Sequence, residues 1–202
     1  VYRESPGPMR LFVVKPAGWK ATDQRPALMF FFGGGWTTGT PKNSIFWAKF
    51  AADLGMVGIA PDYRTKGRND VSPLGSVADS RAALRWVQDH AAELGLDPAR
   101  IAVGGNSAGG HVALWTGITA TPPGSDPAEA PRLKPAALIL FSTVSDTTAE
   151  RGYTPKRFGV DALGREELGS QTVGFGEQRQ QQVQQVVPWQ FGALEVLCEI
   201  GR

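Results

Sequence analysis

The chain has 202 residues, 42% of them hydrophobic, which is enough for one domain with a sizeable core. Its formal net charge is +2 and the basic residues are spread along the chain, so no nucleic-acid-binding patch or polybasic membrane anchor is indicated. Cys198 is the only cysteine and the only histidines are His90 and His111, so we expect no internal disulfide, no bound metal and no cofactor.

The sequence leaves the cellular location of the protein open. No apolar run reaches membrane-spanning length, so no membrane span is expected. Because the chain opens with Val1 rather than methionine, we expect it to be trimmed or a fragment, and a removed signal peptide would leave no trace. A secreted and a cytoplasmic protein are both consistent with this sequence.

The first predicted elements are two strands. Residues 9–15 are short, β-branched and aromatic and are followed by Pro16, which predicts a strand. Residues 27–32 form an unbroken apolar run, which is typical of a strand buried on both faces in a parallel sheet.

A glycine-rich loop, Gly33-Gly34-Gly35-Trp36, follows the second strand. Glycines at a strand end leave backbone N–H groups uncovered, and in acyl-transfer chemistry such groups bind the oxyanion. A plain strand-to-helix loop is the alternative. A phosphate loop is a third reading, since Gly34 and Gly39 have its glycine spacing, but that motif then requires lysine and this chain has Thr40-Pro41.

The middle of the chain alternates between helices and strands. Helical periodicity covers residues 41–54, and a buried strand is predicted over residues 56–60. Asp62 and Arg64 follow it, and we interpret them as structural pairing groups. Ser76-Val77-Ala78-Asp79 matches a capping box, which predicts a helix from Ser76 to about Leu94, and Asp97-Pro98 predicts a turn before the next strand.

The strongest motif lies in residues 101–111, where an apolar run, the G-x-S-x-G pentapeptide from Gly105 to Gly109 and a helix-like run follow without a gap. Strand, tight turn and helix are the context of a nucleophile elbow, in which the two flanking glycines allow strand and helix to approach closely. A dinucleotide-binding loop is excluded because its third position would be Asn106 rather than glycine. We interpret Ser107 as a nucleophile, with a simple glycine-rich turn as the alternative.

The order of elements predicts an α/β fold with a mostly parallel sheet and helices on both faces. Residues 136–141 are the last strand candidate, and the pattern defines a core over residues 1–163. Residues 164–202 form an atypical tail, glutamine-rich over residues 177–187, which a truncation or a frame shift near residue 165 would explain. A sheet that ends at residues 136–141 exposes an apolar edge.

These residues resemble the α/β-hydrolases, specifically the esterase branch near hormone-sensitive-lipase-like and acetyl-xylan or feruloyl-esterase-like enzymes. The resemblance covers residues 9–161 and rests on FFGGGW (31–36), PDYR (61–64), DPARIAVGGNSAGGH (97–111) and LILF (138–141). One departure is Phe32, which stands where much of that branch has the histidine of its HGGG loop.

The resemblance implies a catalytic serine at Ser107 between the elbow glycines Gly105 and Gly109. It also implies an oxyanion hole formed by the N–H groups of Gly34, Gly35 and Ala108. Such enzymes hydrolyse small carboxylic esters, with short acyl groups or linked to carbohydrate, through an acyl-enzyme. No cofactor is implied.

The resemblance does not extend to the other two residues of the catalytic triad. Family members carry an acid and then a histidine after the catalytic serine. Here the only later histidine is His111, one helical turn past Ser107, and we expect it to pack beside the elbow rather than act as a base. His90 is expected at a solvated helix end. Asp146 follows the last strand and is the one candidate acid, whereas Asp161 has no positional support.

The leading hypothesis is therefore a serine ester hydrolase that lacks a catalytic histidine in this chain and is impaired as a result. A non-catalytic hydrolase-fold protein that binds a small ligand or a partner is the first alternative, and a serine peptidase of the same fold is a weaker one. The sequence does not determine the oligomeric state.

Overall fold

The five strands form one mixed sheet in the order β1-β3-β2-β4-β5. The computed structural model describes residues 1–4, 7–117, 127–132 and 134–145. β1 pairs antiparallel with β3, and the other pairs are parallel. The strands are β1 (Leu11–Val14), β2 (Arg25–Phe31), β3 (Val57–Pro61), β4 (Leu96–Asn106) and β5 (Ala137–Phe141).

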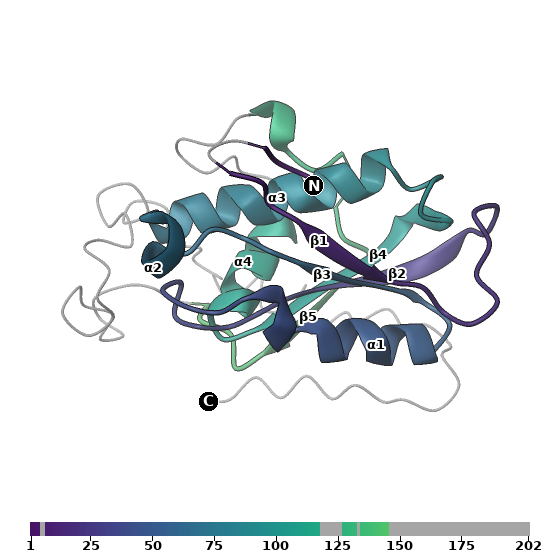
Figure 1. The fold of residues 1–202 in the computed structure, drawn as a ribbon, viewed down its shortest axis with the longest axis horizontal. Coiled ribbons are helices and arrows are strands. Elements are labelled where there is room, and N and C mark those ends of the chain that lie inside the picture. Colours follow the sequence, from purple (N-terminus) through teal and green to yellow (C-terminus); the bar gives the residue numbers. More distant parts are fainter. Residues whose placement is uncertain (5–6, 118–126, 133, 146–202) are drawn as a thin grey trace, which may run out of the picture.

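Helices cover both faces of this sheet, as the sequence predicts. Helix α1 (Ile45–Asp53) lies on one face, and α3 (Pro73–Asp89) and α4 (Ala108–Gly117) lie on the other (Figure 1). Three short elements join them: η1 (Pro41–Asn43), α2 (Lys66–Asn69) and η2 (Pro127–Glu129). The predicted α/β class, a mostly parallel sheet with helices on both faces, is confirmed.

The unbroken apolar run of β2 reflects burial on both faces of the sheet. Successive side chains of a strand point to opposite faces, so Met29 and Phe31 enter the larger core under α3 and α4. Leu28 and Phe30 enter a smaller core against Ala51 of α1. This two-sided burial is why the strand does not alternate between apolar and polar residues.

The predicted capping box is wrong. Helix α3 begins at Pro73 with Ser72 as its N-cap, so Ser76 lies inside the helix, and the helix ends at Asp89 rather than near Leu94. The Ser76 hydroxyl donates instead to the Arg64 carbonyl at 2.7 Å, and it is fully buried. A serine and an aspartate three residues apart match a capping box in sequence, but here both face the core.

Other element boundaries also differ from the sequence predictions. β4 begins at Leu96, not at Ile101, and includes Asp97 and Pro98. Its pairing with β2 is irregular near Arg25, which lets a segment with turn-like residues remain in the ladder. The helix predicted over residues 41–54 is divided into η1 and α1 at Ser44.

Three further sequence predictions concern the sheet edge, the boundary of the core and membrane spans. β5 is the edge of the described sheet, and Leu138 and Phe141 on it are more than one-third exposed, as an apolar edge predicts. The predicted boundary between residues 163 and 164 lies outside the described residues and stays a prediction. No helix in the described ranges is long and apolar enough to cross a membrane.

Buried Asp79 of α3 is the charged group on which the segment after β3 depends. Its carboxylate, with a fully buried side chain, pairs with Arg64 at 2.8 Å and lies 3.4 Å from Arg3. The sequence interpretation of Asp62 and Arg64 as structural pairing groups is confirmed, since Asp62 pairs with Arg68 at 2.6 Å.

Replacing Asp79 with asparagine should leave the Arg64 guanidinium without its counter-charge in the protein interior. We expect Asp79→Asn to lower the free energy of unfolding by about 3 kcal/mol, measured by urea denaturation. Asp70→Asn is the matched control, because it breaks an exposed pair with Lys66, and it should leave the urea midpoint unchanged. Equal midpoints for the two variants would contradict the structural role of Asp79.

Candidate active site

Ser107 lies at the turn between β4 and α4, in a strained backbone conformation. Its φ is +53°, a left-handed value that is uncommon for a residue with a side chain. The side chain is half-buried, and its neighbour Asn106 is exposed. A partly exposed serine in a strained strand-to-helix turn has the geometry that a nucleophile elbow requires.

Gly105 and Gly109 allow the strand and the helix to touch at this turn. A Cβ atom at Gly105 would lie 2.3 Å from the carbonyl group of Gly109. A Cβ atom at Gly109 would lie 2.3 Å from the Phe32 carbonyl oxygen and 2.4 Å from that of Phe31. These contacts are with backbone atoms, which cannot move aside, so both positions require glycine.

The loop after β2 is a tight turn built on positive φ angles. Gly34 has φ +141° and Gly35 has φ +59°, and Trp36 also has φ +59°. The N–H groups of Thr37 and Thr38 both donate to the Gly34 carbonyl, at 3.1 and 3.0 Å. We call residues 33–36 the glycine loop.

The glycine loop and the residue before it lie against the elbow. A Cβ atom at Gly33 would lie 2.7 Å from the Asn106 side chain, and one at Gly109 would lie 2.3 Å from the Phe32 carbonyl oxygen. At the far end of the loop, the Trp36 ring meets the His111 ring edge-on, with centroids 5.1 Å apart. The pairing of β2 with β4 thus brings together the two glycine features that the sequence predicts at strand ends.

Three backbone N–H groups at this junction have no acceptor among the described residues. Within the described part of the chain, the N–H groups of Gly34, Gly35 and Ala108 donate to no protein acceptor. Ala108 is the first residue of α4, where N–H groups have no partner inside the helix. The Ser107 N–H is different, because it donates to the Phe141 carbonyl at 3.0 Å.

His111 packs beside the elbow, as the sequence predicts, and its ring is buried. The Trp115 indole N–H donates to His111 Nε2 at 3.3 Å. Since an indole nitrogen only donates, Nε2 carries the lone pair and Nδ1 carries the proton. That Nδ1 has no partner among the described residues. Burial lowers the pKa of His111 from 6.5 to about 4, so the ring is neutral at pH 7.

These contacts leave His111 without the means to act as a base toward Ser107. The one lone pair of its ring is already used by Trp115 within the core. His90 is the C-cap of α3, where its ring stacks on Trp86 with centroids 3.9 Å apart. Asp146 and Asp161 lie outside the described residues, and no cluster of metal-ligating side chains occurs in the described ranges.

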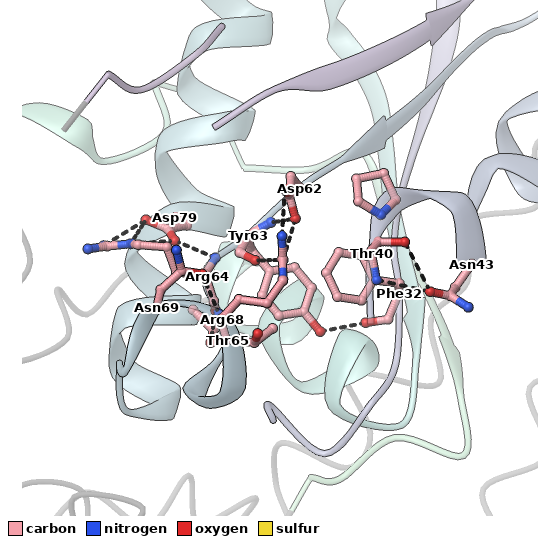
Figure 2. A network of polar contacts seen from close by, with 12 residues as sticks. Phe32, Thr40, Asn43, Asp62, Tyr63, Arg64, Thr65, Arg68, Asn69 and Asp79 are labelled. Carbon is pink, nitrogen blue, oxygen red and sulfur yellow. Dashed lines mark hydrogen bonds and ion pairs between the residues drawn. The ribbon is translucent and has the colours of Figure 1, made fainter. Parts of the chain in front are cut away.

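Phe32 replaces the histidine of the family's loop with an apolar packing contact. Its ring is fully buried and stacks on Tyr63 at a centroid distance of 4.1 Å. The Tyr63 hydroxyl donates to the Phe32 carbonyl at 2.6 Å (Figure 2). Sequence reasoning missed Tyr63, although it lies between Asp62 and Arg64 in the PDYR motif, because a tyrosine there gives no chemical signal of its own.

Fold and site together define an α/β-hydrolase of the esterase type. The family model described as BD-FAE matches residues 14–191, and the chain belongs to this family within the esterase branch of the α/β-hydrolases.

Named relatives agree with this assignment. The chain is 42% identical over 91 residues to carboxylesterase NlhH of Mycobacterium tuberculosis, a match that covers 45% of this chain and 28% of the relative. It is 40% identical to the butyrate-bound esterase Est2 of Thermogutta terrifontis, with a TM-score of 0.70, covering 84% of this chain and 62% of that one. A form of that esterase phosphonylated by cyclosarin is also 40% identical, with a TM-score of 0.68 over 74% of this chain and 57% of that one. The chain therefore spans less than two-thirds of the length of these relatives.

A methyl group at Gly109 should prevent the close approach of α4 to the carbonyl groups of Phe31 and Phe32. We expect Gly109→Ala to lower the free energy of unfolding by about 3 kcal/mol in urea denaturation. Gly7→Ala is the matched control, because a Cβ atom at Gly7 meets nothing within 4 Å. If both variants unfold at the wild-type midpoint, the backbone contact at Gly109 is not the constraint described.

The buried neutral ring of His111 should make stability depend on pH. Its native pKa of about 4 lies below the value of 6.5 in the unfolded chain, so the unfolded state binds more protons between these values. The stabilisation that comes from the neutral ring is therefore present above about pH 6.5 and is lost as the pH falls. We expect the free energy of unfolding to decrease by about 2 kcal/mol between about pH 7.5 and about pH 5.

His111→Gln removes this contribution and should flatten the pH dependence of unfolding by that amount. His90→Gln is the comparison variant, since it changes the other histidine, at the end of α3, and leaves the buried His111 ring in place. A wild-type pH dependence in His111→Gln would show that the buried ring does not titrate as described.

Proposed function

We propose that this chain carries the nucleophile and the oxyanion donors of a carboxylic-ester hydrolase. Ser107 attacks the ester carbonyl, and the N–H groups of Gly34, Gly35 and Ala108 stabilise the oxyanion that forms. The ester C–O bond breaks, the alcohol leaves with the proton that the Ser107 hydroxyl loses, and an acyl-enzyme remains. Water then hydrolyses it, which releases the carboxylic acid and restores the hydroxyl. The observation that carries the proposal is the strained serine next to three N–H groups without protein acceptors among the described residues.

The proposed substrate class rests on the uncharged composition of the glycine loop and on a relative's ligand. Gly33, Gly34 and Gly35 have no side chains, and no charged residue lies in the loop. An uncharged ester with a small acyl group fits such a site, and a relative with 40% identity binds butyrate. Short-chain acyl esters are therefore the substrates that we propose.

Activation of the serine is the limiting step in this chain. Neither His111, with its lone pair occupied, nor His90, at the end of α3, supplies a base. Loss of a triad member reduces turnover by several orders of magnitude and leaves the contribution of the oxyanion donors. We therefore propose slow, serine-dependent turnover for the 202-residue chain.

The absence of a histidine after His111 also favours one alternative function. On that reading the scaffold binds a small ligand or a partner and performs no covalent chemistry. The two functions differ in the reactivity of Ser107, because only the first requires its oxygen to form a covalent bond. A serine peptidase of the same fold stays the weaker alternative, and a proline peptide assayed beside the ester separates it.

The test is covalent labelling of Ser107 by a p-nitrophenyl phosphonate, followed by peptide mass spectrometry. We expect stoichiometric modification of the peptide that contains Ser107 and none in Ser107→Ala. Hydrolysis of p-nitrophenyl butyrate should be slow in the wild-type chain and should fall to the uncatalysed rate in Ser107→Ala. Equal rates with an unlabelled serine would overturn the proposal in favour of the binding function.

A further inference from the structure

The glycine loop is held at its beginning by a side chain from another part of the chain. The Tyr63 hydroxyl donates to the Phe32 carbonyl at 2.6 Å, and the two rings stack (Figure 2). The same carbonyl oxygen touches Gly109 of the elbow. Tyr63 therefore fixes the peptide at which the glycine loop leaves β2, directly beside the turn that carries Ser107.

The far end of the loop is held by backbone groups from the same segment as Tyr63. The N–H of Lys66 donates to the Trp36 carbonyl at 2.8 Å, and the N–H of Gly67 donates to the Thr37 carbonyl at 2.9 Å. A Cβ atom at Gly67 would lie 2.6 Å from that Thr37 oxygen, so the two backbones are in direct contact. We call residues 63–67 the brace.

The brace is itself fixed by two ion pairs. Arg64 binds the buried Asp79 carboxylate through its side chain and through its backbone N–H. Arg68 makes a two-pronged pair with Asp62, at 2.6 and 3.0 Å, and also donates to the Tyr63 carbonyl at 2.7 Å. Figure 2 shows both ion pairs near Tyr63. Planar two-pronged pairs fix orientation as well as distance, so the brace has little freedom.

We propose that the brace sets the conformation of the glycine loop, and that Tyr63 is a positioning residue for the N–H groups of Gly34 and Gly35. This proposal rests on the proposed function of those groups as oxyanion donors. Donors that are held in place before the reaction stabilise an oxyanion without a reorganisation cost.

The chemistry of Tyr63 fits this role. Its side chain is fully buried, and burial raises the pKa of the hydroxyl well above its usual value, so the group stays a donor at neutral and alkaline pH. Removal of the hydroxyl takes away its bond to the Phe32 carbonyl and leaves the stacked ring in place. The loop would then lose its hydrogen bond at Phe32 and keep those at Trp36 and Thr37.

Tyr2 provides a matched control, because its hydroxyl also binds a backbone carbonyl close to Tyr63. Its hydroxyl donates to the Asp62 carbonyl at 2.7 Å, one residue before the brace, and not to the glycine loop. Tyr63→Phe and Tyr2→Phe thus each remove one hydroxyl-to-carbonyl hydrogen bond of nearly equal length.

The first measurement is amide hydrogen exchange in the full chain, which needs no turnover. We expect the amides of Thr37 and Thr38, which close the loop, to exchange at least about tenfold faster in Tyr63→Phe than in the wild type. In Tyr2→Phe they should exchange at the wild-type rate. Amides of β2 should be unchanged in both variants.

The second measurement is the Ser107-dependent hydrolysis of p-nitrophenyl butyrate. Tyr63→Phe should lower kcat about tenfold and leave KM within about twofold, because the loop acts on the transition state. Tyr2→Phe should keep both constants. Gly67→Ala tests the other end of the loop, where the new methyl group displaces the Thr37 carbonyl, and it should also speed exchange at Thr37 and Thr38.

Two results would overturn the proposal that the brace orders the loop. One is amide exchange at Thr37 and Thr38 at the wild-type rate in both Tyr63→Phe and Gly67→Ala. The other is exchange there as fast in Tyr2→Phe as in Tyr63→Phe, which would indicate general loosening. A chain without Ser107-dependent turnover would overturn the proposed function instead. The exchange data would still decide whether the brace orders the loop.

Discussion

The close approach of backbone atoms at Gly109 is the contact on which the rest of this site depends. Helix α4 lies so near the carbonyl groups of Phe31 and Phe32 that a single methyl group has no room. This contact sets the distance between the end of β2 and the turn at Ser107. Because backbone atoms form this contact, a change of side-chain rotamer does not relieve it.

The turns on both sides of this backbone contact are strained. Ser107 has φ +53°, and Gly34, Gly35 and Trp36 of the glycine loop also have positive φ angles. Such strained segments persist only where their surroundings fix them. Here the surroundings are the brace, the ion pair of Arg64 with Asp79 and the Trp36–His111 contact.

His111 shows how a residue that is chemically suited to catalysis is used for packing. Its lone pair accepts the Trp115 N–H and its ring supports Trp36, both inside the core. Burial lowers the pKa of His111 to about 4 and keeps the ring neutral at pH 7, so it adds no charge beside the turn at Ser107.

By itself, the sequence determined the α/β class, the presence of strands β2 and β3, the turn at Ser107 and the glycine loop. Each of these depends on local signals: apolar runs, glycine spacing and the order of elements. Only the tertiary structure decided that Ser76 and Asp79 face the core rather than cap a helix, and that β4 continues through Asp97 and Pro98. It also assigned the Tyr63 hydroxyl to the Phe32 carbonyl, 31 residues away in the chain. The physical reason is that hydrogen bonds and ion pairs between distant segments depend on how the elements pack, and a local pattern of residues carries no record of that packing.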